Sequence, residues 1–156
     1  MTQLEEYAHL LTCIDNLNEA RQILLNIKKS SDNPLVNPAF QFALIEYSKP
    51  YKKSRGEVKP NHKLKNEHIP LQYLDLHDKI INARDQIHAH SDLTVDDAKV
   101  YVFNTNYGKR VGISKNIIYD TEMLEKIDAI TDLIEQSLDS MHEKEKQLKT
   151  TLPVNS

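Results

Sequence analysis

Several side chains that can carry out chemistry occur close together in one short segment of the chain. This segment contains Arg84, Asp85, His88, His90 and Asp92. A guanidinium group presents a planar fork of donors that matches two oxygens of a phosphate group. A histidine titrates near neutral pH, so it can accept or donate a proton. Together these residue types suit a site that binds an anionic group and transfers protons.

A purely structural role also accounts for the arginine. Arg84 shares a helical row with Ile81, close to the expected core, and a buried guanidinium group is costly unless it is paired. It can therefore form an ion pair that fastens the helix end, with Asp85, Asp92 or an acid of the last helix as its partner.

A metal site is a further alternative. Its ligands would be histidines and aspartates of the same segment: His77, Asp85, His88, His90 and Asp92. His88 and His90 are two residues apart, which places their rings on different sides of a helix, and no cysteine joins them. We therefore expect no bound metal and no cofactor.

The segment resembles the signature of the HEPN superfamily, in which an arginine is followed directly by a polar residue and, four to six residues beyond the arginine, by a histidine. In this sequence these positions are Arg84, Asp85 and His90. The flanking stretches Leu76-His77-Asp78-Lys79 and Ala89-His90-Ser91-Asp92 are similar to the abortive-infection branch of that superfamily. The rest of the chain resembles the family only in its helical layout.

The resemblance implies a homodimeric, metal-independent endoribonuclease in which two copies place their motifs in one shared cleft. It implies that Arg84 binds phosphate, that His90 transfers protons and that Asp85 orients the arginine or the helix end. Such a protein is expected to be a prokaryotic toxin or phage-defence effector, with an antitoxin protein as a candidate partner. The alternative is a non-catalytic HEPN-like module that binds a nucleotide, RNA or a partner protein.

The spacing of the motif raises a question of helix geometry. Six steps along an ideal helix turn the chain by about 600°, so His90 lies about 120° around the axis from Arg84. His88 is four residues beyond Arg84 and lies on the same side of the helix. Either the helix unwinds before His90, as Ser91 and Asp92 would permit, or His88 is the true neighbour of Arg84.

A basic segment precedes the motif. Residues 49–65 contain seven lysines and arginines and one acid, although the whole chain has a net charge of −3. Positive charge and aromatic rings can guide RNA, so we assign RNA binding to four residues of this segment and to one histidine of the motif: Tyr51, Lys52, Lys53, Arg55 and His88. The alternative for the segment is an ordinary solvated loop.

The apolar pattern predicts the elements that position these residues. Apolar side chains recur at three- and four-residue steps in four stretches, which predicts four helices: 3–29, about 38–47, about 70–91, and one that starts at 120 or 121. Thr2 and Glu5 can form a capping box at the start of the first helix. Residues 48–69 are predicted to form a long loop, because Pro50 ends the second helix.

The β-branched and aromatic run 99–103 and the run 110–113 predict a short hairpin between the third and fourth helices. A single hairpin is marginally stable alone, so we expect it to lie on the helices. The predicted fold is mainly α, a HEPN-like four-helix bundle with this hairpin. It forms a single domain over 1–150, with a disordered tail at 151–156.

The remaining features concern the compartment. Cys13 is the only cysteine and lies in an apolar helical stretch, which predicts a core residue in a reducing environment. No apolar run is long enough to span a bilayer, and the acidic N-terminus lacks the layout of a signal peptide. We therefore expect a cytoplasmic protein without a membrane partner.

Overall fold

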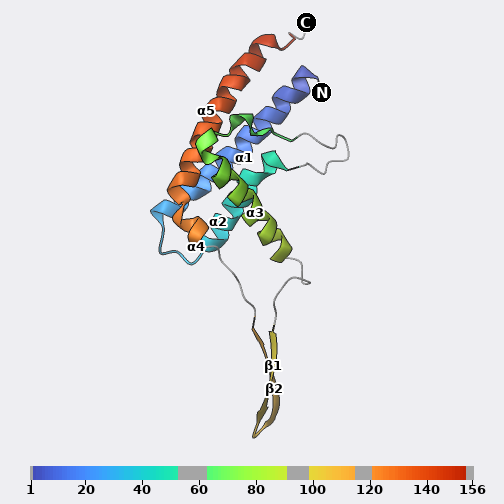
Figure 1. Cartoon of the computed structure of the whole chain (residues 1–156), viewed down its shortest axis with the longest axis vertical. Coiled ribbons are helices and arrows are strands. Elements are labelled where there is room, and N and C mark those ends of the chain that lie inside the picture. The colour runs from blue at the N-terminus through green and yellow to red at the C-terminus, as the bar shows by residue number, and fades with distance from the viewer. Residues whose placement is uncertain (1, 53–62, 91–98, 115–120, 154–156) are drawn as a thin grey trace.

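The computed structural model describes residues 2–52, 63–90, 99–114 and 121–153, and within these ranges the chain is mainly helical (Figure 1). The α-helices are α1 (Gln3–Lys29), α2 (Val36–Ser48), α3 (Leu74–His90), α4 (Thr121–Glu125) and α5 (Ile127–Thr151). Between α3 and α4, the strands β1 (Lys99–Thr105) and β2 (Gly108–Ser114) form an antiparallel hairpin. The predicted mainly α class, with a hairpin after the third long helix, is confirmed.

Helix α1 begins where its sequence provides a cap. The Glu5 amide donates to Thr2 Oγ1 at 3.2 Å and the Thr2 amide donates to Glu5 Oε2 at 2.9 Å, which forms the predicted capping box. The helix then runs to Lys29, as predicted. It is the central helix of the bundle, because it packs against both α2 and α5.

One apolar core joins the long helices. Its largest fully buried apolar side chains are Leu17 and Leu24 of α1, Tyr47 of α2, Ile80 of α3, and Ile130, Leu133, Ile134 and Met141 of α5. Removing one such aliphatic side chain from water contributes about 1.5–3 kcal/mol. Cys13 belongs to the same core, so its predicted packing role is confirmed. Among the described residues, no helix has the length and apolar character that crossing a membrane requires.

Two ion pairs reinforce the contact between α1 and α5. Arg21 Nε lies 2.8 Å from Glu135 Oε1, and Lys28 Nζ lies 2.5 Å from Asp128 Oδ1. All four side chains are partly exposed, so each pair contributes less than about 1 kcal/mol. Two acids of α5, Asp128 and Glu135, thus pair with basic residues of α1.

The last predicted helix is divided into two. Lys126 has φ −89° and ψ 12°, so α4 ends directly before it and α5 begins directly after it. Helix α5 then continues to Thr151, which makes the first residue of the predicted tail helical. Residues 154–156 of that tail lie outside the described part of the chain.

The segment predicted as a loop at 48–69 contains short 3₁₀ turns, and a third such turn leads into α3. They are η1 (Lys49–Tyr51), η2 (Asn66–His68) and η3 (Leu71–Tyr73). Pro50 lies in η1, directly after the end of α2, as the clash of its ring with a helical carbonyl predicts. Residues 53–62 lie outside the described part of the chain.

The hairpin has a tight turn of two residues. Thr105 pairs with Gly108, which leaves Asn106 and Tyr107 at the tip. Gly108 has a φ of +106°, a conformation that other residues rarely adopt. The hydroxyl of Thr105 donates to the Gly108 carbonyl at 2.7 Å and closes the turn.

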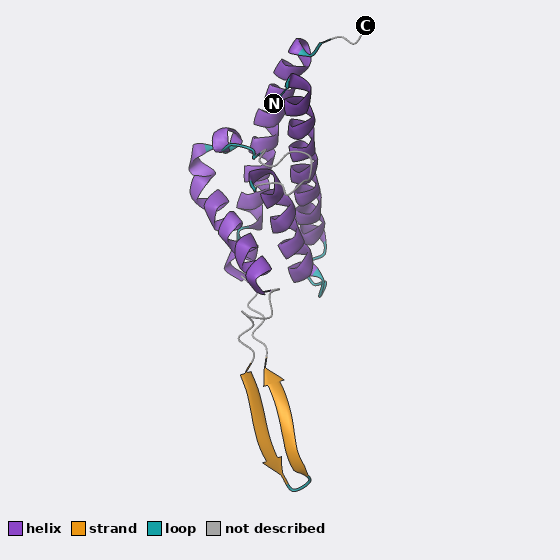
Figure 2. Cartoon of the chain, turned by 90° about the vertical axis from the view of Figure 1, so that its right-hand side faces the viewer, coloured by secondary structure: helices purple, strands orange, loops and turns teal. Residues whose placement is uncertain are grey.

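The hairpin does not lie on the helices, so that expectation is wrong. In Figures 1 and 2 the two strands extend beyond the end of the helices instead of covering them. Side chains on both of its faces are exposed, including Val102 at 61% and Phe103 at 55%. The strands are held by their own antiparallel ladder and by the turn.

A buried polar cluster fixes α3 against α2 and η1. The Tyr47 hydroxyl lies 2.8 Å from Nδ1 of His77, and the ring of Tyr51 packs on His77 with 4.6 Å between centroids. Burial lowers the pKa of His77 and raises the pKa of Tyr47. Both groups are therefore neutral at pH 7, and they share one buried hydrogen bond.

Tyr47→Phe is expected to lower the free energy of unfolding by about 1–3 kcal/mol, because Nδ1 of His77 would stay buried without its hydrogen-bond partner. Urea denaturation at neutral pH measures this change. Tyr7→Phe is the matched control, since the Tyr7 hydroxyl contacts Glu145 at 3.4 Å where both groups are only partly buried. Equal losses in the two variants would contradict a special role for the bond between Tyr47 and His77.

Candidate functional site

Arg84 and Asp85 lie on α3, one turn and a half before its end. Nη1 of Arg84 donates to Oδ1 of Asp85 at 3.1 Å. The side chain of Arg84 is 27% exposed and that of Asp85 is 47% exposed, so this pair lies at the surface. The guanidinium group is therefore more accessible than its place beside an apolar row predicts.

Asp85 also binds a cation from a distant part of the sequence. Nζ of Lys52, which directly follows η1, donates to Oδ2 of Asp85 at 2.7 Å. The hydrogen bond from Lys52 is the largest influence on the carboxyl group and, together with Arg84, holds the pKa of Asp85 below its usual range. The carboxylate thus stays ionised and holds two positive side chains, which leaves the group with a net positive charge.

This arrangement can bind an anion. A guanidinium group has five N–H donors. Asp85 is the one hydrogen-bond partner of Arg84 among the described residues. The other donors can reach two oxygens of a phosphate, while Asp85 restricts the rotation of the arginine.

Helix α3 continues through His90 without unwinding. By helix geometry, position 88 therefore lies on the same side as position 84, and position 90 lies about 120° around the axis. The side chains of residues 86–90 lie outside the described part of the structure. The backbone thus favours His88 over His90 as the neighbour of Arg84 within one chain.

The residues assigned to RNA binding differ in their placement. Lys52 is partly exposed and lies beside the motif. Tyr51 is only 2% exposed and its ring packs on Tyr47 and His77. The assignment of Tyr51 is wrong, because core atoms cover the ring on which a base would stack. Lys53 and Arg55 lie outside the described residues.

Of the candidate metal ligands, only His77 and Asp85 have side chains in the part of the chain that the structure describes. There, no group of three or more histidine, cysteine, aspartate or glutamate side chains can hold a metal ion. His77 is buried and bonds to Tyr47, away from the surface pair of Arg84 and Asp85. Asp92 lies outside the described residues.

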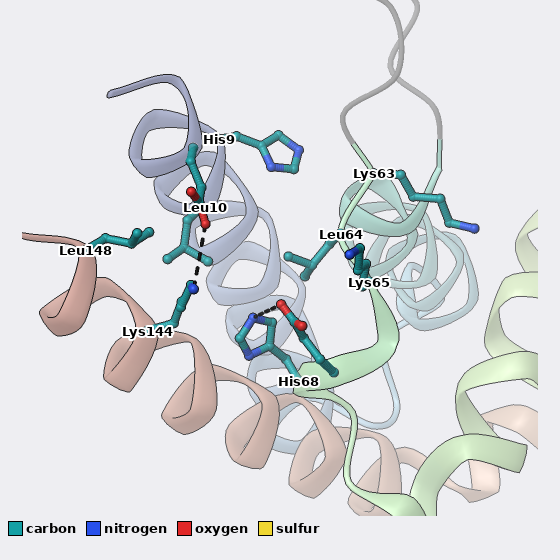
Figure 3. A pocket seen from close by; sticks show the side chains of 10 residues that line it. His9, Leu10, Lys63, Leu64, Lys65, His68, Lys144 and Leu148 are labelled. Carbon is teal, nitrogen blue, oxygen red and sulfur yellow. Dashed lines mark ion pairs between the residues drawn. The ribbon is translucent and has the colours of Figure 1, made fainter. Parts of the chain in front are cut away.

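A separate cavity of about 180 Å³ lies between α1, α5 and the segment that leads into η2 (Figure 3). Its lining holds two acids and three lysines: Glu6, Glu67, Lys63, Lys65 and Lys144. Glu6 lies 3.7 Å from Nζ of Lys144, and Glu67 lies 3.7 Å from Nε2 of His68. His68 is buried, which lowers its pKa, and its Nδ1 lies 2.9 Å from Oγ of Ser140. None of the motif residues lines this cavity, so it is distinct from the site at Arg84.

The single thiol near this cavity is unreactive. Sγ of Cys13 lies 3.7 Å from Nε2 of His9, a pairing that could suggest a nucleophile and its base. Burial, however, raises the pKa of Cys13 to about 11, so the thiol remains protonated at neutral pH. Cys13 is therefore not a candidate nucleophile.

The ion pair between Lys52 and Asp85 is the feature of the site that the sequence did not reveal. The two residues are 33 positions apart, and no local spacing relates them. The positive charge of the basic segment suggests that one of its residues could pair with Asp85. Charge alone does not show that this residue is Lys52 and not one of its basic neighbours.

The chain was compared with protein-family models, with curated proteins and with solved structures, and none of the three comparisons finds a match.

Asp85→Asn is expected to lower the free energy of unfolding by less than about 1 kcal/mol, because both of its ion pairs are partly exposed. Urea denaturation of the variant and the wild-type protein tests this. A loss as large as that expected for Tyr47→Phe would indicate that Lys52, Arg84 and Asp85 have a structural role and hold η1 against α3.

Proposed function

We propose that this protein is a metal-independent endoribonuclease of the HEPN type that acts as a homodimer. The observation that carries the proposal is the accessible guanidinium group of Arg84, held by Asp85 on a continuous helix that also bears His88 and His90. Arginine for the phosphate and histidine for proton transfer are the groups that cleavage by a 2′-hydroxyl requires.

Each residue has a distinct role in this reaction. Arg84 binds the phosphate that is attacked and stabilises the negative charge that develops on its oxygens. Asp85 fixes the orientation of Arg84. His90 transfers the proton between the 2′-hydroxyl, the leaving oxygen and solvent. Lys52, which shares the carboxylate of Asp85, adds positive charge beside the phosphate and connects the basic segment to the site.

A dimer resolves the separation of Arg84 and His90 around the helix. Position 90 lies about 120° around the helix axis from position 84, so one copy alone does not place the two residues on the same side of the helix. Two copies related by a twofold axis bring a pair of α3 helices together, so that arginines and histidines of both copies line one cleft. The long helices α1, α2 and α3, with α4 and α5 as a divided fourth, supply a layout that suits a HEPN bundle.

Uncontrolled RNA cleavage harms a cell, so the proposal extends to a prokaryotic toxin or phage-defence effector of the cytoplasm, held in check by an antitoxin protein. The non-catalytic alternative is a module in which the same positive group binds RNA, a nucleotide or a partner protein. The cluster of Arg84, Asp85 and Lys52 alone would suffice for that role, because it provides anion binding without proton transfer.

His90→Ala is expected to reduce cleavage of single-stranded RNA by about 10²–10⁴-fold, the usual contribution of a placed proton-transfer group. Arg84→Ala is expected to abolish cleavage, because it removes the phosphate ligand. Gel analysis of end-labelled RNA, with and without EDTA, measures both effects, and EDTA should change nothing.

His88→Ala is the matched control for His90→Ala, because it removes the same ring two positions away on the same helix. A modest loss supports the assignment of His90, whereas a loss equal to that of His90→Ala assigns proton transfer to His88. If the wild-type protein binds RNA through Arg84 without cleaving it, the binding module is correct.

The protein is expected to be a dimer in solution. Light scattering in physiological salt should give about twice the chain mass of 18.0 kDa. A monomer at tens of micromolar would exclude the shared cleft and, with it, the proposed use of His90.

A further inference from the structure

The two faces of the hairpin differ in their chemistry. Side chains alternate across a strand, and paired residues of neighbouring strands share a face. Tyr101 is paired with Gly112 and Phe103 with Arg110, so these four residues form one face. The opposite face carries the pair of Val102 and Val111 and, nearer the turn, the pair of Asn104 and Lys109. We call the first of these the aromatic face.

The aromatic face presents two uncovered rings. Tyr101 is 46% exposed and Phe103 is 55% exposed. Their rings are stacked, with 6.3 Å between centroids and 20° between planes. Gly112 has no side chain, and a Cβ atom at that position would lie 3.2 Å from Cε2 of Phe103. The glycine therefore lets the phenyl ring lie close to the backbone of β2, next to the tyrosine.

The hairpin is positively charged throughout. Residues 99–114 contain Lys99, Lys109 and Arg110 and no acid. Arg110 lies directly across from Phe103 in the ladder and so belongs to the aromatic face. Among the described residues, no acidic side chain pairs with Lys109 or Arg110. These cations are available to an anionic ligand from outside the chain.

We propose that the aromatic face of the hairpin is a binding site for single-stranded RNA. Unpaired bases stack on Tyr101 and Phe103, and Arg110 contacts a phosphate of the same strand. Stacking on an exposed ring requires a free base face, which a duplex does not offer. The choice of RNA as the ligand rests on the proposed function, since a ribonuclease must hold a strand that extends beyond the phosphate it cleaves.

A second copy of the hairpin fits this face less well than RNA does. Two hairpins packed together would bring like charges close to one another, because neither contains an acid. A polyanion instead neutralises them and releases its counterions. The charge of the hairpin thus favours a nucleic acid over self-association.

The test compares two double variants of the full chain. Tyr101→Ala/Phe103→Ala removes both rings. Val102→Ala/Val111→Ala is the control, because it truncates two side chains, more exposed than the rings, on the opposite face of the hairpin. The probe is a short fluorescent 2′-O-methyl RNA of mixed sequence, which lacks the 2′-hydroxyl needed for cleavage. Fluorescence anisotropy gives the affinity, and circular dichroism confirms that each variant is folded.

Loss of both rings is expected to weaken binding by at least about 5-fold, which is the effect of losing one stacked base at about 1 kcal/mol. The valine control should bind nearly as tightly as the wild-type protein. Tyr101→Phe keeps the ring and should retain the affinity. Arg110→Gln should reduce the slope of log affinity against log salt by about 0.7, the value for one phosphate contact on a single strand.

Two results would overturn the proposal. The first is equal affinity of the ring-deleted variant and the wild-type protein. The second is a change in mass by light scattering without a change in affinity, which would assign the aromatic face to self-association. Cleavage of unmodified RNA is measured in parallel. Ring-dependent binding without cleavage supports the hairpin site and rejects the ribonuclease, whereas cleavage with ring-independent affinity retains the ribonuclease and rejects the hairpin site.

Discussion

The hydrogen bond between Tyr47 and His77 fixes the position of α3, the helix on which the candidate site depends. Helix α3 has fewer partners in the bundle than α1, and its main contact is with α2. A tyrosine hydroxyl and an imidazole buried together restrict this contact to one arrangement, because any shift along the helix would leave both groups without a partner. Because this contact places α3, it also determines where Arg84 lies on the surface of the bundle.

The carboxylate of Asp85 holds two cations, Lys52 and Arg84, in place near the end of α3. The negative charge of Asp85 offsets part of the repulsion between the side chains of Lys52 and Arg84, and this allows the two cations to lie close together. The result is a positive group that is held in place and still open to solvent. Preorganised charge of this kind loses little entropy when an anion arrives, and it weakens as salt screens the partly exposed pairs.

Features with local causes could be predicted from the sequence. The helix at 3–29 follows from its apolar period and its capping box, and the hairpin follows from a β-branched run and a turn ending in glycine. Features with distant causes could not. Nothing near Tyr51 distinguishes a core ring from a surface ring, because its burial depends on His77 of another helix. The break at Lys126 involves neither proline nor glycine, so composition gave no sign of it.

The hairpin illustrates the limit of a general rule. Marginal stability of an isolated hairpin predicts a partner surface, yet these strands of seven residues each are held by their ladder and by the turn at Gly108. The candidate site shows the same limit. Its residue types were apparent in one segment, but the fold, and not the segment, determines which cation of the basic run meets Asp85.

The hairpin also has two free edges, because each strand pairs only with the other. An unpaired edge presents backbone amides and carbonyls that can template the addition of a strand from another molecule, which is the first step of aggregation. Lys99, Lys109 and Arg110 act as gatekeepers here, since every hairpin carries the same sign of charge. Repulsion between hairpins therefore opposes the pairing of their edges, and high ionic strength weakens this repulsion.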